Sequence, residues 1–221
     1  MTTIKYTSIQ LDTGLDGCFY QAGATTPIIV LAHGAGAPFN HHHMASIADA
    51  LAKNNIGTFR FNFPFMQAGS RRVDDVTTSV STIEMALNEV KSLAPDSPVF
   101  LGGHSFGGRM ATHLAATQPD IAKGLILFSF PLHVSKKPAT KRAAHLADIK
   151  SPMLFISGTR DTLAEFSLMT EVLGGLPKAS MHWLETADHS FKILKRTRTS
   201  DVDVYTEAAD AASDWIKTLE K

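Results

Sequence analysis

The chain has 221 residues, of which 44% are hydrophobic, and this length suits one α/β domain with a sizeable core. Its 21 lysines and arginines equal its 21 aspartates and glutamates in number, so no charge excess favours nucleic acid or an anionic membrane surface. We therefore expect a single domain over residues 1–221 whose partner is a small molecule.

Two further features concern the cellular compartment. Residues 1–6 lack a charged start followed by an apolar stretch, so no signal peptide is predicted, and no apolar run approaches transmembrane length. Cys18 is the only cysteine, which excludes an intramolecular disulfide and fits a reducing compartment. We expect a cytoplasmic protein that does not associate with membranes.

The N-terminal part predicts a hairpin followed by a buried strand. Residues 3–11 and 16–21 read as short extended runs around the turn sequence at 12–14, which is typical of an antiparallel hairpin. Residues 27–32 are apolar without alternation, as in a parallel strand covered on both faces. The next expected elements are a helix over 41–54 capped by Asn40, a strand over 57–63, an irregular stretch over 64–73, and a helix over 74–94 opened by Asp74 and Asp75.

The remaining sequence alternates between strands and helices. Strands are predicted over 98–102, 124–130, 152–157 and 179–184, and helices over 108–117, 139–146, 163–173 and 201–219. This alternation indicates a three-layer α/β/α sandwich around a mostly parallel sheet of about seven or eight strands. Residues 131–151 are too few for a helical cap domain, so we expect none. In such sheets the ligand site lies at the carboxyl ends of the strands.

The most informative stretch is Gly103-His104-Ser105-Phe106-Gly107, which stands between a predicted strand and a predicted helix. The pattern G-x-S-x-G in this context is typical of a sharp turn that lifts a nucleophilic serine above the sheet. The two glycines suit the crowding where strand and helix converge. The alternative is a glycine-rich turn with an idle serine.

A serine hydroxyl needs a base to take its proton and a third group to orient that base. His189 follows the last predicted strand, and Asp161 follows the strand before it, so both are expected at the same edge of the sheet as Ser105. Asp188 is the alternative acid, but neighbours in sequence usually point apart, which favours Asp161. The alternative for His189 is a surface histidine in a loop.

Acyl transfer also needs hydrogen-bond donors for the developing oxyanion. These are usually the backbone N–H after the nucleophile and one from the loop after the first parallel strand. Here they are the N–H groups of Phe106 and Ala35, the latter in the loop 33–37. The positive end of the helix that begins at Ser105 is expected to favour the negative charge of the same oxyanion.

Other polar and apolar residues are candidates for secondary roles. The three adjacent histidines at 41–43 diverge by about 100 degrees each on a helix, so no metal site is expected there. Arg71-Arg72 and the run 195–198 are small basic patches that either face solvent or meet a substrate carboxylate. Near the presumed mouth of the site lie Arg109, His104 and His133, and an acyl pocket is expected from Phe65, Met66, Leu132 and His133.

Taken together, these motifs resemble the α/β-hydrolase superfamily over nearly the whole chain. More closely, they are similar to the compact dienelactone-hydrolase-like group, which includes the hydrolase-like subunit of a nonspecific-lethal histone acetyltransferase complex. The motifs that carry the resemblance are HGAGA at 33–37 with Asn40-His41, FNFPFM at 61–66, GGHSFGGR at 102–109, PLH at 131–133, GTRD at 158–161 and DHSF at 188–191.

The superfamily resemblance implies Ser105 as nucleophile, Asp161 as acid and His189 as base, with no metal or organic cofactor. Dienelactone hydrolases proper use a cysteine at the elbow, whereas this chain has Ser105 there and its one cysteine in the N-terminal hairpin. This difference argues against dienelactone itself as the substrate.

The resulting hypothesis is a lidless serine hydrolase of small esters or thioesters that works through an acyl-enzyme. The alternative is a non-catalytic interaction subunit on a hydrolase scaffold, because a fold alone does not determine a function. A third possibility keeps the triad but cleaves peptide bonds or transfers acyl groups. The acyl group, the leaving group and the oligomeric state do not follow from the sequence.

Overall fold

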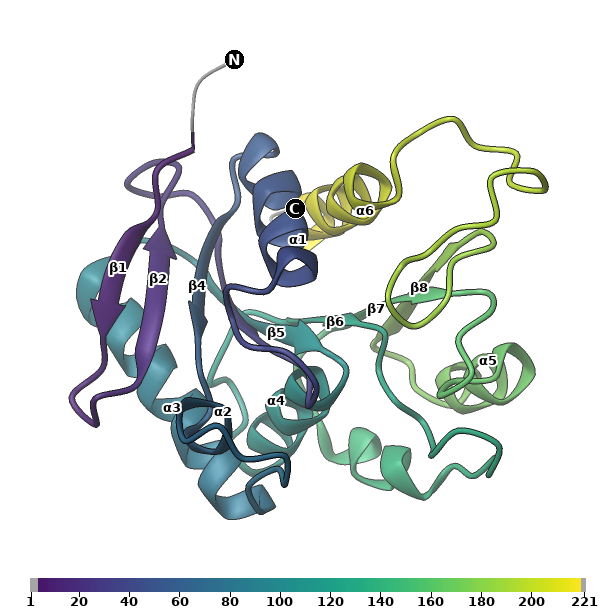
Figure 1. Ribbon diagram of the computed structural model, residues 1–221, viewed down its shortest axis with the longest axis horizontal. Coiled ribbons are helices and arrows are strands. Elements are labelled where there is room, and N and C mark those ends of the chain that lie inside the picture. The colour runs from purple at the N-terminus through teal and green to yellow at the C-terminus, as the bar shows by residue number, and fades with distance from the viewer. Residues whose placement is uncertain (1–3, 220–221) are drawn as a thin grey trace.

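The computed structural model describes residues 4–219 and confirms the predicted architecture (Figure 1). Within these residues, eight strands form one sheet in the order β1-β2-β4-β3-β5-β6-β7-β8. The first two strands make the expected antiparallel hairpin, and β2 also pairs antiparallel with β4, while the pairs from β4 to β8 are parallel. The strands are β1 (Thr7–Gln10), β2 (Asp16–Tyr20), β3 (Ile28–Ala32), β4 (Gly57–Phe61), β5 (Val99–His104), β6 (Leu125–Phe128), β7 (Met153–Gly158) and β8 (Ala179–Leu184).

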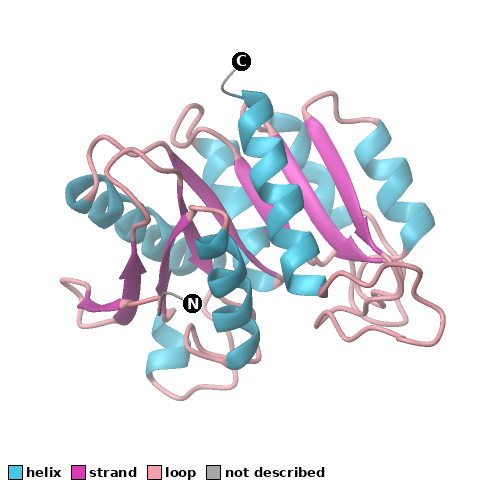
Figure 2. Ribbon diagram, turned by 90° about the horizontal axis from the view of Figure 1, so that it is seen from above, coloured by secondary structure: helices cyan, strands magenta, loops and turns pink. Residues whose placement is uncertain are grey.

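Helices cover both faces of this sheet (Figure 2). One face carries α1 (His42–Lys53) and α6 (Val204–Leu219), which pack against each other. The other face carries α3 (Val76–Leu93) and α4 (Phe106–Thr117), which also pack side by side. Three shorter elements are α2 (Pro64–Gln67), the 3-10 helix η1 (Lys141–Asp148), which packs on α4, and α5 (Phe166–Gly174), which packs beside β8.

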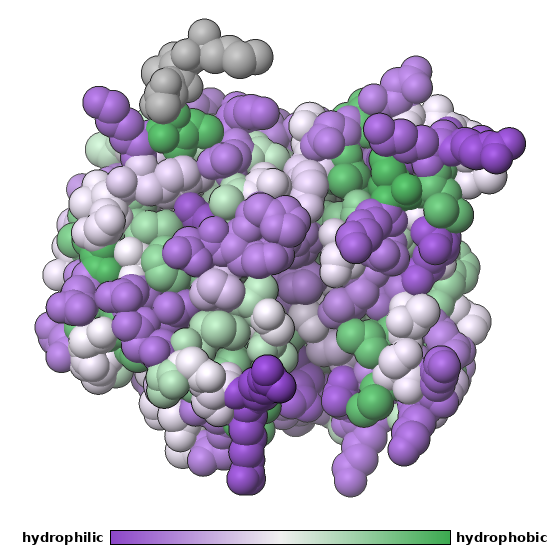
Figure 3. All heavy atoms as spheres, viewed as in Figure 1, coloured by the Kyte–Doolittle hydropathy of each residue, from purple (hydrophilic) through white to green (hydrophobic). Residues whose placement is uncertain are grey.

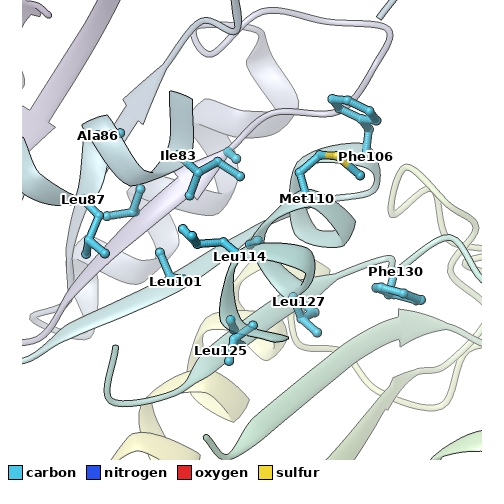
Figure 4. Close-up of a cluster of buried hydrophobic side chains, with 14 of the residues drawn as sticks. Ile83, Ala86, Leu87, Leu101, Phe106, Met110, Leu114, Leu125, Leu127 and Phe130 are labelled. Atoms are coloured by element: carbon cyan, nitrogen blue, oxygen red, sulfur yellow. The ribbon is translucent and has the colours of Figure 1, made fainter. Parts of the chain in front are cut away.

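The hydrophobic core lies in two layers, one on each face of the sheet. All five residues of β3 are buried, because this strand is covered on both sides, as its unbroken apolar run predicts. Alternate residues of the parallel strands point into the two layers: Leu101 and Leu127 belong to the α3/α4 side, and Ile126 belongs to the α1/α6 side. Figure 4 shows the first layer, in which side chains of α3 and α4 meet those of β5 and β6.

Hydrophilic side chains cover most of the face seen in Figure 3, with smaller groups of hydrophobic ones between them. One hydrophobic group lies at the upper right, over the loop that leads from β8 to α6. Two of the exposed large hydrophobic residues, Leu194 and Val202, belong to this loop. None of the helices within residues 4–219 is long and apolar enough to cross a membrane.

Two local predictions were wrong. The helix α1 is capped by His41 rather than Asn40, because the imidazole of His41 accepts a hydrogen bond from the backbone N–H of His43. The stretch after β4 is not wholly irregular, since Pro64 starts the short helix α2, and proline is favoured at a first helical position. Between β6 and β7 the chain forms only a bridge at Val134 and Lys137 and the helix η1, so the described structure has no cap domain.

The strand β5 and the helix α4 approach β3 so closely that two positions require glycine. A Cβ on Gly107 would lie 2.5 Å from the carbonyl oxygen of Ala32 and 2.6 Å from that of His33, and both are backbone atoms that cannot move aside. A Cβ on Gly103 would lie 2.6 Å from the same Ala32 oxygen. These contacts set the position of the turn between β5 and α4.

We expect Gly107→Ala to lower the free energy of unfolding by about 2–3 kcal/mol, because the added methyl group forces β3 and α4 apart. Chemical denaturation followed by circular dichroism measures this change. Gly36→Ala is the matched control, since a Cβ there meets nothing within 4 Å and it is expected to change stability little. Equal stability of the two variants would contradict the packing argument.

Candidate active site

The turn between β5 and α4 holds Ser105 in an unusual backbone conformation. Its φ of 53° and ψ of −114° lie outside the regions that non-glycine residues ordinarily adopt. The backbone N–H of Ser105 donates to the carbonyl of Phe128 at 2.9 Å, and its own carbonyl accepts from Arg109 at 3.0 Å. The chain therefore passes from strand to helix at this one residue, at the carboxyl end of the sheet.

The structure brings Ser105, His189 and Asp161 together from three separate segments. The Nε2 atom of His189 lies 2.8 Å from the hydroxyl oxygen of Ser105, and its Nδ1 lies 2.8 Å from a carboxylate oxygen of Asp161. The Asp161 side chain is fully buried, and its other oxygen accepts from the backbone N–H of Leu163 at 2.8 Å. A carboxylate can only accept from Nδ1–H, so Nε2 of a neutral His189 is free to accept the serine proton.

The alternative acid, Asp188, has a different set of partners. One of its carboxylate oxygens accepts from the backbone N–H groups of Ser190 and Lys192 at 2.8 and 3.0 Å. Asp188 thereby closes the loop that carries His189, while Asp161 contacts the imidazole itself. Chemically, the arrangement is a hydroxyl, a base and a buried carboxylate in one line of hydrogen bonds.

A cavity of about 630 Å³ opens beside Ser105 and His189. It lies between the loop after β3, the first turn of α1 and the loop after His189. Most of its lining is polar or small. The lining residues are Gly34, Ala35, Gly36, Ala37, His41, His42, His43, Met44, His104, Ser105, His189, Ser190, Phe191, Lys192 and Tyr205.

Two backbone N–H groups at this site have no hydrogen-bond partner within the described chain. Phe106 is the first residue of α4, and Ala35 lies exposed in the loop after β3, at the same cavity as Ser105. Neither N–H donates to a protein acceptor among residues 4–219. Their role as donors to an oxyanion stays a prediction.

The four residues predicted for an acyl pocket lie outside this cavity. Phe65 is buried, and its ring packs on the rings of Phe63 and Phe106 in the core. Met66 packs against the same core layer, and Leu132 is completely buried. His133 is also buried and lines a second cavity beside Arg109. The loops after β4 and β6 direct these side chains to the α3/α4 side of the sheet, where the first three join the core and His133 borders the second cavity, whereas the cavity at Ser105 opens toward α1 and α6.

A group of buried histidines connects the segments of the site. The Nε2 of His104 lies 2.9 Å from the backbone carbonyl oxygen of His189, so this nitrogen carries a hydrogen and donates it. The ring of His43 stands edge-on to that of His104, and its Nδ1 lies 2.9 Å from the hydroxyl of Tyr205 in α6. The elbow, the histidine loop, α1 and α6 are thus linked in one network.

These imidazoles are neutral near pH 7. Burial lowers the pKa of His104 well below its usual value and, with the nearby His41 and His42, lowers the pKa of His43 to about 4. Burial also lowers the pKa of His33 to about 4. His33 receives a hydrogen bond from the backbone N–H of Phe63 at 3.0 Å, which places the loop after β3 against the end of β4.

His43 and Tyr205 are residues of this cavity that the sequence motifs do not predict, although His43 belongs to the histidine run 41–43. A usable signal was the spacing of His43, four residues before the buried Ile47, which places both side chains on one face of α1. His41 and His42 line the outer part of the same cavity. Within residues 4–219, no group of three or more side chains is placed to hold a metal ion. Arg71-Arg72 and the run 195–198 do not line this cavity.

The chain is similar in sequence or structure to several known proteins. Residues 25–217 match a family described as "Alpha/beta hydrolase domain". A dienelactone hydrolase from Anabaena variabilis has a similar structure, with a TM-score of 0.79, 19% identity and coverage of 98% of this chain and 99% of that one. An α/β serine hydrolase without lid from Xanthomonas campestris has a TM-score of 0.71, 18% identity and coverage of 97% and 96%. At these identities the likeness concerns the fold.

A curated relative is the monoglyceride lipase of Mus musculus, which is 30% identical over 121 residues. The match covers 51% of this chain and 38% of the mouse protein, so the chain spans well under half the length of that relative. The relation to a subunit of a histone acetyltransferase complex stays a prediction.

The lowered pKa of His43 predicts that the free energy of unfolding depends on pH. Its folded-state pKa of about 4 lies below the ordinary value of 6.5, so the unfolded chain takes up a proton first as the pH falls, and stability is lost from about pH 6.5 down to about pH 4. Between about pH 7 and pH 5 this loss is on the order of 2 kcal/mol. We expect His43→Phe, which keeps a ring but cannot titrate, to lose less stability over this range.

Urea denaturation at both pH values measures the difference. His42→Phe is the control, because His42 is exposed, and its pH dependence is expected to equal that of the unsubstituted protein. If both variants showed the same pH dependence, His43 would not be the buried neutral group described here.

Proposed function

Because the chain belongs to the α/β-hydrolase family, we propose that it is a serine hydrolase that cleaves small ester or thioester substrates through an acyl-enzyme intermediate. The single observation that carries this proposal is the line of hydrogen bonds from Ser105 through His189 to Asp161, with 2.8 Å at each step. Idle side chains have no physical reason to align a hydroxyl, a base and a buried carboxylate at the mouth of one cavity.

In the proposed reaction the Ser105 oxygen attacks the substrate carbonyl while Nε2 of His189 takes the serine proton. Asp161 orients the imidazole and stabilises its charged form, as the buried carboxylate at Nδ1 allows. The N–H groups of Phe106 and Ala35 donate to the tetrahedral oxyanion, and the amino end of α4 favours negative charge at the same place. His189 then returns the proton to the leaving group, and water, activated by the same base, releases the acid.

The substrate class is supported by the shape and lining of the site. The cavity is open to one side of Ser105 and has no cap in the described chain, which suits small substrates. Proteins with similar structures or sequences include a dienelactone hydrolase, an esterase and a monoglyceride lipase, whose names concern carboxylic ester chemistry. The serine at the elbow is the nucleophile suited to such esters when paired with a histidine base. We also propose that the protein is located in the reducing cytoplasm, with which its one cysteine, the buried Cys18, is compatible.

Ser105→Ala is expected to lower kcat/KM for short-chain p-nitrophenyl esters by at least about 1000-fold, since no nucleophile remains. It is also expected to abolish labelling by a fluorophosphonate probe. Ser190→Ala is the matched control, because Ser190 lines the same cavity but its hydroxyl is not bonded to the His189 ring. It is expected to keep the labelling and most of the activity.

An intact protein that neither hydrolyses these esters nor reacts with the probe would contradict the proposed function and favour a non-catalytic role. Esters of graded acyl length and the matching thioesters, measured side by side, would define the acyl group. Amine and alcohol acceptors in the same assay would show whether the acyl group passes to water.

His104 is proposed as a positioning residue, because its N–H holds the backbone carbonyl of His189 at 2.9 Å. His104→Phe keeps the ring shape but loses this donor, and we expect kcat to fall roughly 10- to 100-fold with little change in KM. His104→Gln retains an N–H donor and is expected to recover part of kcat. Loss of thermal stability in both variants with unchanged kcat would indicate a purely structural role.

A further inference from the structure

A second cavity, of about 440 Å³, lies on the other side of the elbow helix from the Ser105 site. It is open to solvent and bordered by the first turns of α4, the loop after β6 and the helix η1. The backbone N–H of Arg109 donates to the carbonyl of Ser105, so this cavity begins one helical turn from the elbow. Its lining residues are Arg109, His113, Leu132, His133, Val134, Lys137, Ala139, Lys141, Arg142 and His145.

The charge of this lining is unusual for a chain that is neutral as a whole. Four permanent cations border the cavity, namely Arg109, Lys137, Lys141 and Arg142, and no carboxylate does. Burial, followed by the nearby Arg142, lowers the pKa of Arg109. Bringing like charges together costs free energy unless an opposite charge offsets it. The carboxylate of Asp148, at the end of η1, partly offsets the lowering of the His145 pKa by burial, but Asp148 is not part of the lining.

Two of the three histidines of the cavity, His133 and His145, already have hydrogen-bond partners for their rings. The hydroxyl of Thr112 donates to the carbonyl of Arg109, so it must accept from Nε2–H of His145 at 2.8 Å. Nε2 of His133 accepts from the backbone N–H of Glu165 at 3.3 Å, and its Nδ1 donates to the carbonyl of Val134 at 3.0 Å. The stacked rings of His113 and His145, with centroids 3.8 Å apart, form one wall.

The donors of the cavity without a full set of partners among the described residues include both guanidinium groups. One nitrogen of Arg142 donates to the carbonyl of His133 at 3.0 Å, which fixes the guanidinium at the cavity and leaves its other N–H groups unused. The half-buried Arg109 has neither a hydrogen bond nor an ion pair from its side chain within the described residues. Guanidinium groups bind oxyanions with two parallel N–H donors, and two of them match an anion with three or more oxygens.

We propose that this cavity binds the phosphate group of a small phosphorylated molecule, held between Arg109 and Arg142. A phosphate carries up to two negative charges and three peripheral oxygens, which suits the four cations and the unused donors better than a single carboxylate does. The exposed Lys137 and Lys141 lie at the rim and attract the anion. This site is separate from the cavity at Ser105 and does not depend on the proposed hydrolysis.

Isothermal titration calorimetry of the whole protein with inorganic phosphate and with pyrophosphate, near neutral pH and at constant ionic strength, tests the proposal. We expect saturable binding at one site, weakened at least about tenfold when both guanidinium groups are removed in Arg109→Met/Arg142→Met. Arg71→Met/Arg72→Met removes the same charge from an exposed segment outside the cavity and is expected to bind as the unsubstituted protein does. The Ser105→Ala variant is also expected to bind phosphate normally, which separates this test from that of the hydrolase activity.

Absence of saturable binding up to roughly 10 mM would overturn the proposal. So would an equal loss of affinity in the Arg71/Arg72 control, which would indicate binding to charge in general, or tighter binding of succinate than of phosphate. If the double variant fails to fold, the single variant Arg109→Lys is measured instead. It keeps the charge but loses the planar pair of donors, and we expect it to bind phosphate more weakly than the unsubstituted protein.

Discussion

The close approach of the elbow to β3 is the constraint on which the rest of the site depends. Gly103 and Gly107 lie so near the backbone carbonyls of Ala32 and His33 that no side chain fits at either position. This contact presses the start of α4 against the central strand and keeps Ser105 at a positive φ. The strain of that conformation is offset by the sheet and helix on both sides of it. The close packing at these two glycines thereby determines the position of the Ser105 hydroxyl.

The same edge of the sheet gathers the partners of that hydroxyl. Asp161 follows β7 and His189 follows β8, and parallel strands bring their carboxyl ends to one side of the molecule. His104 adds a direct link, because it belongs to the end of β5 and donates to the backbone of the loop after β8. The His104 ring also packs closely on Gly34, since a Cβ at Gly34 would lie 2.9 Å from its Nδ1 and would displace the ring. The network joins the end of β5 to the α1/α6 side of the sheet, since His43 belongs to α1 and Tyr205 to α6.

The elbow helix separates two cavities of different chemistry. On the α1 side, the buried histidines His43 and His104 and several small residues lie at the cavity beside Ser105, which suits the uncharged ester carbonyl of the proposed reaction. On the α4 and η1 side, Arg109 and three further cations border the cavity, and no carboxylate among residues 4–219 lines it, which suits a ligand that is already an anion. Both cavities border α4, whose N-cap residue Ser105 lines the first cavity and whose fourth residue, Arg109, lines the second. A chain of neutral net charge can thus present a strongly charged surface locally, because charge balance over the whole sequence says nothing about its distribution in space.

The sequence by itself determined the alternation of strands and helices, the antiparallel hairpin, the elbow pattern and the strand ends at which Asp161 and His189 stand. These features follow from local periodicity and from the order of elements, which a parallel sheet converts into position. Only the tertiary structure decided which face of α4 borders which cavity, since that depends on how the loops after β4 and β6 pack. It turned Phe65 and Leu132 into the core, brought His43 and Tyr205 to Ser105 from distant helices, and placed Arg142 beside Arg109. Contacts between residues far apart in the chain leave no periodic trace, so packing alone defines the shape and the charge of both cavities.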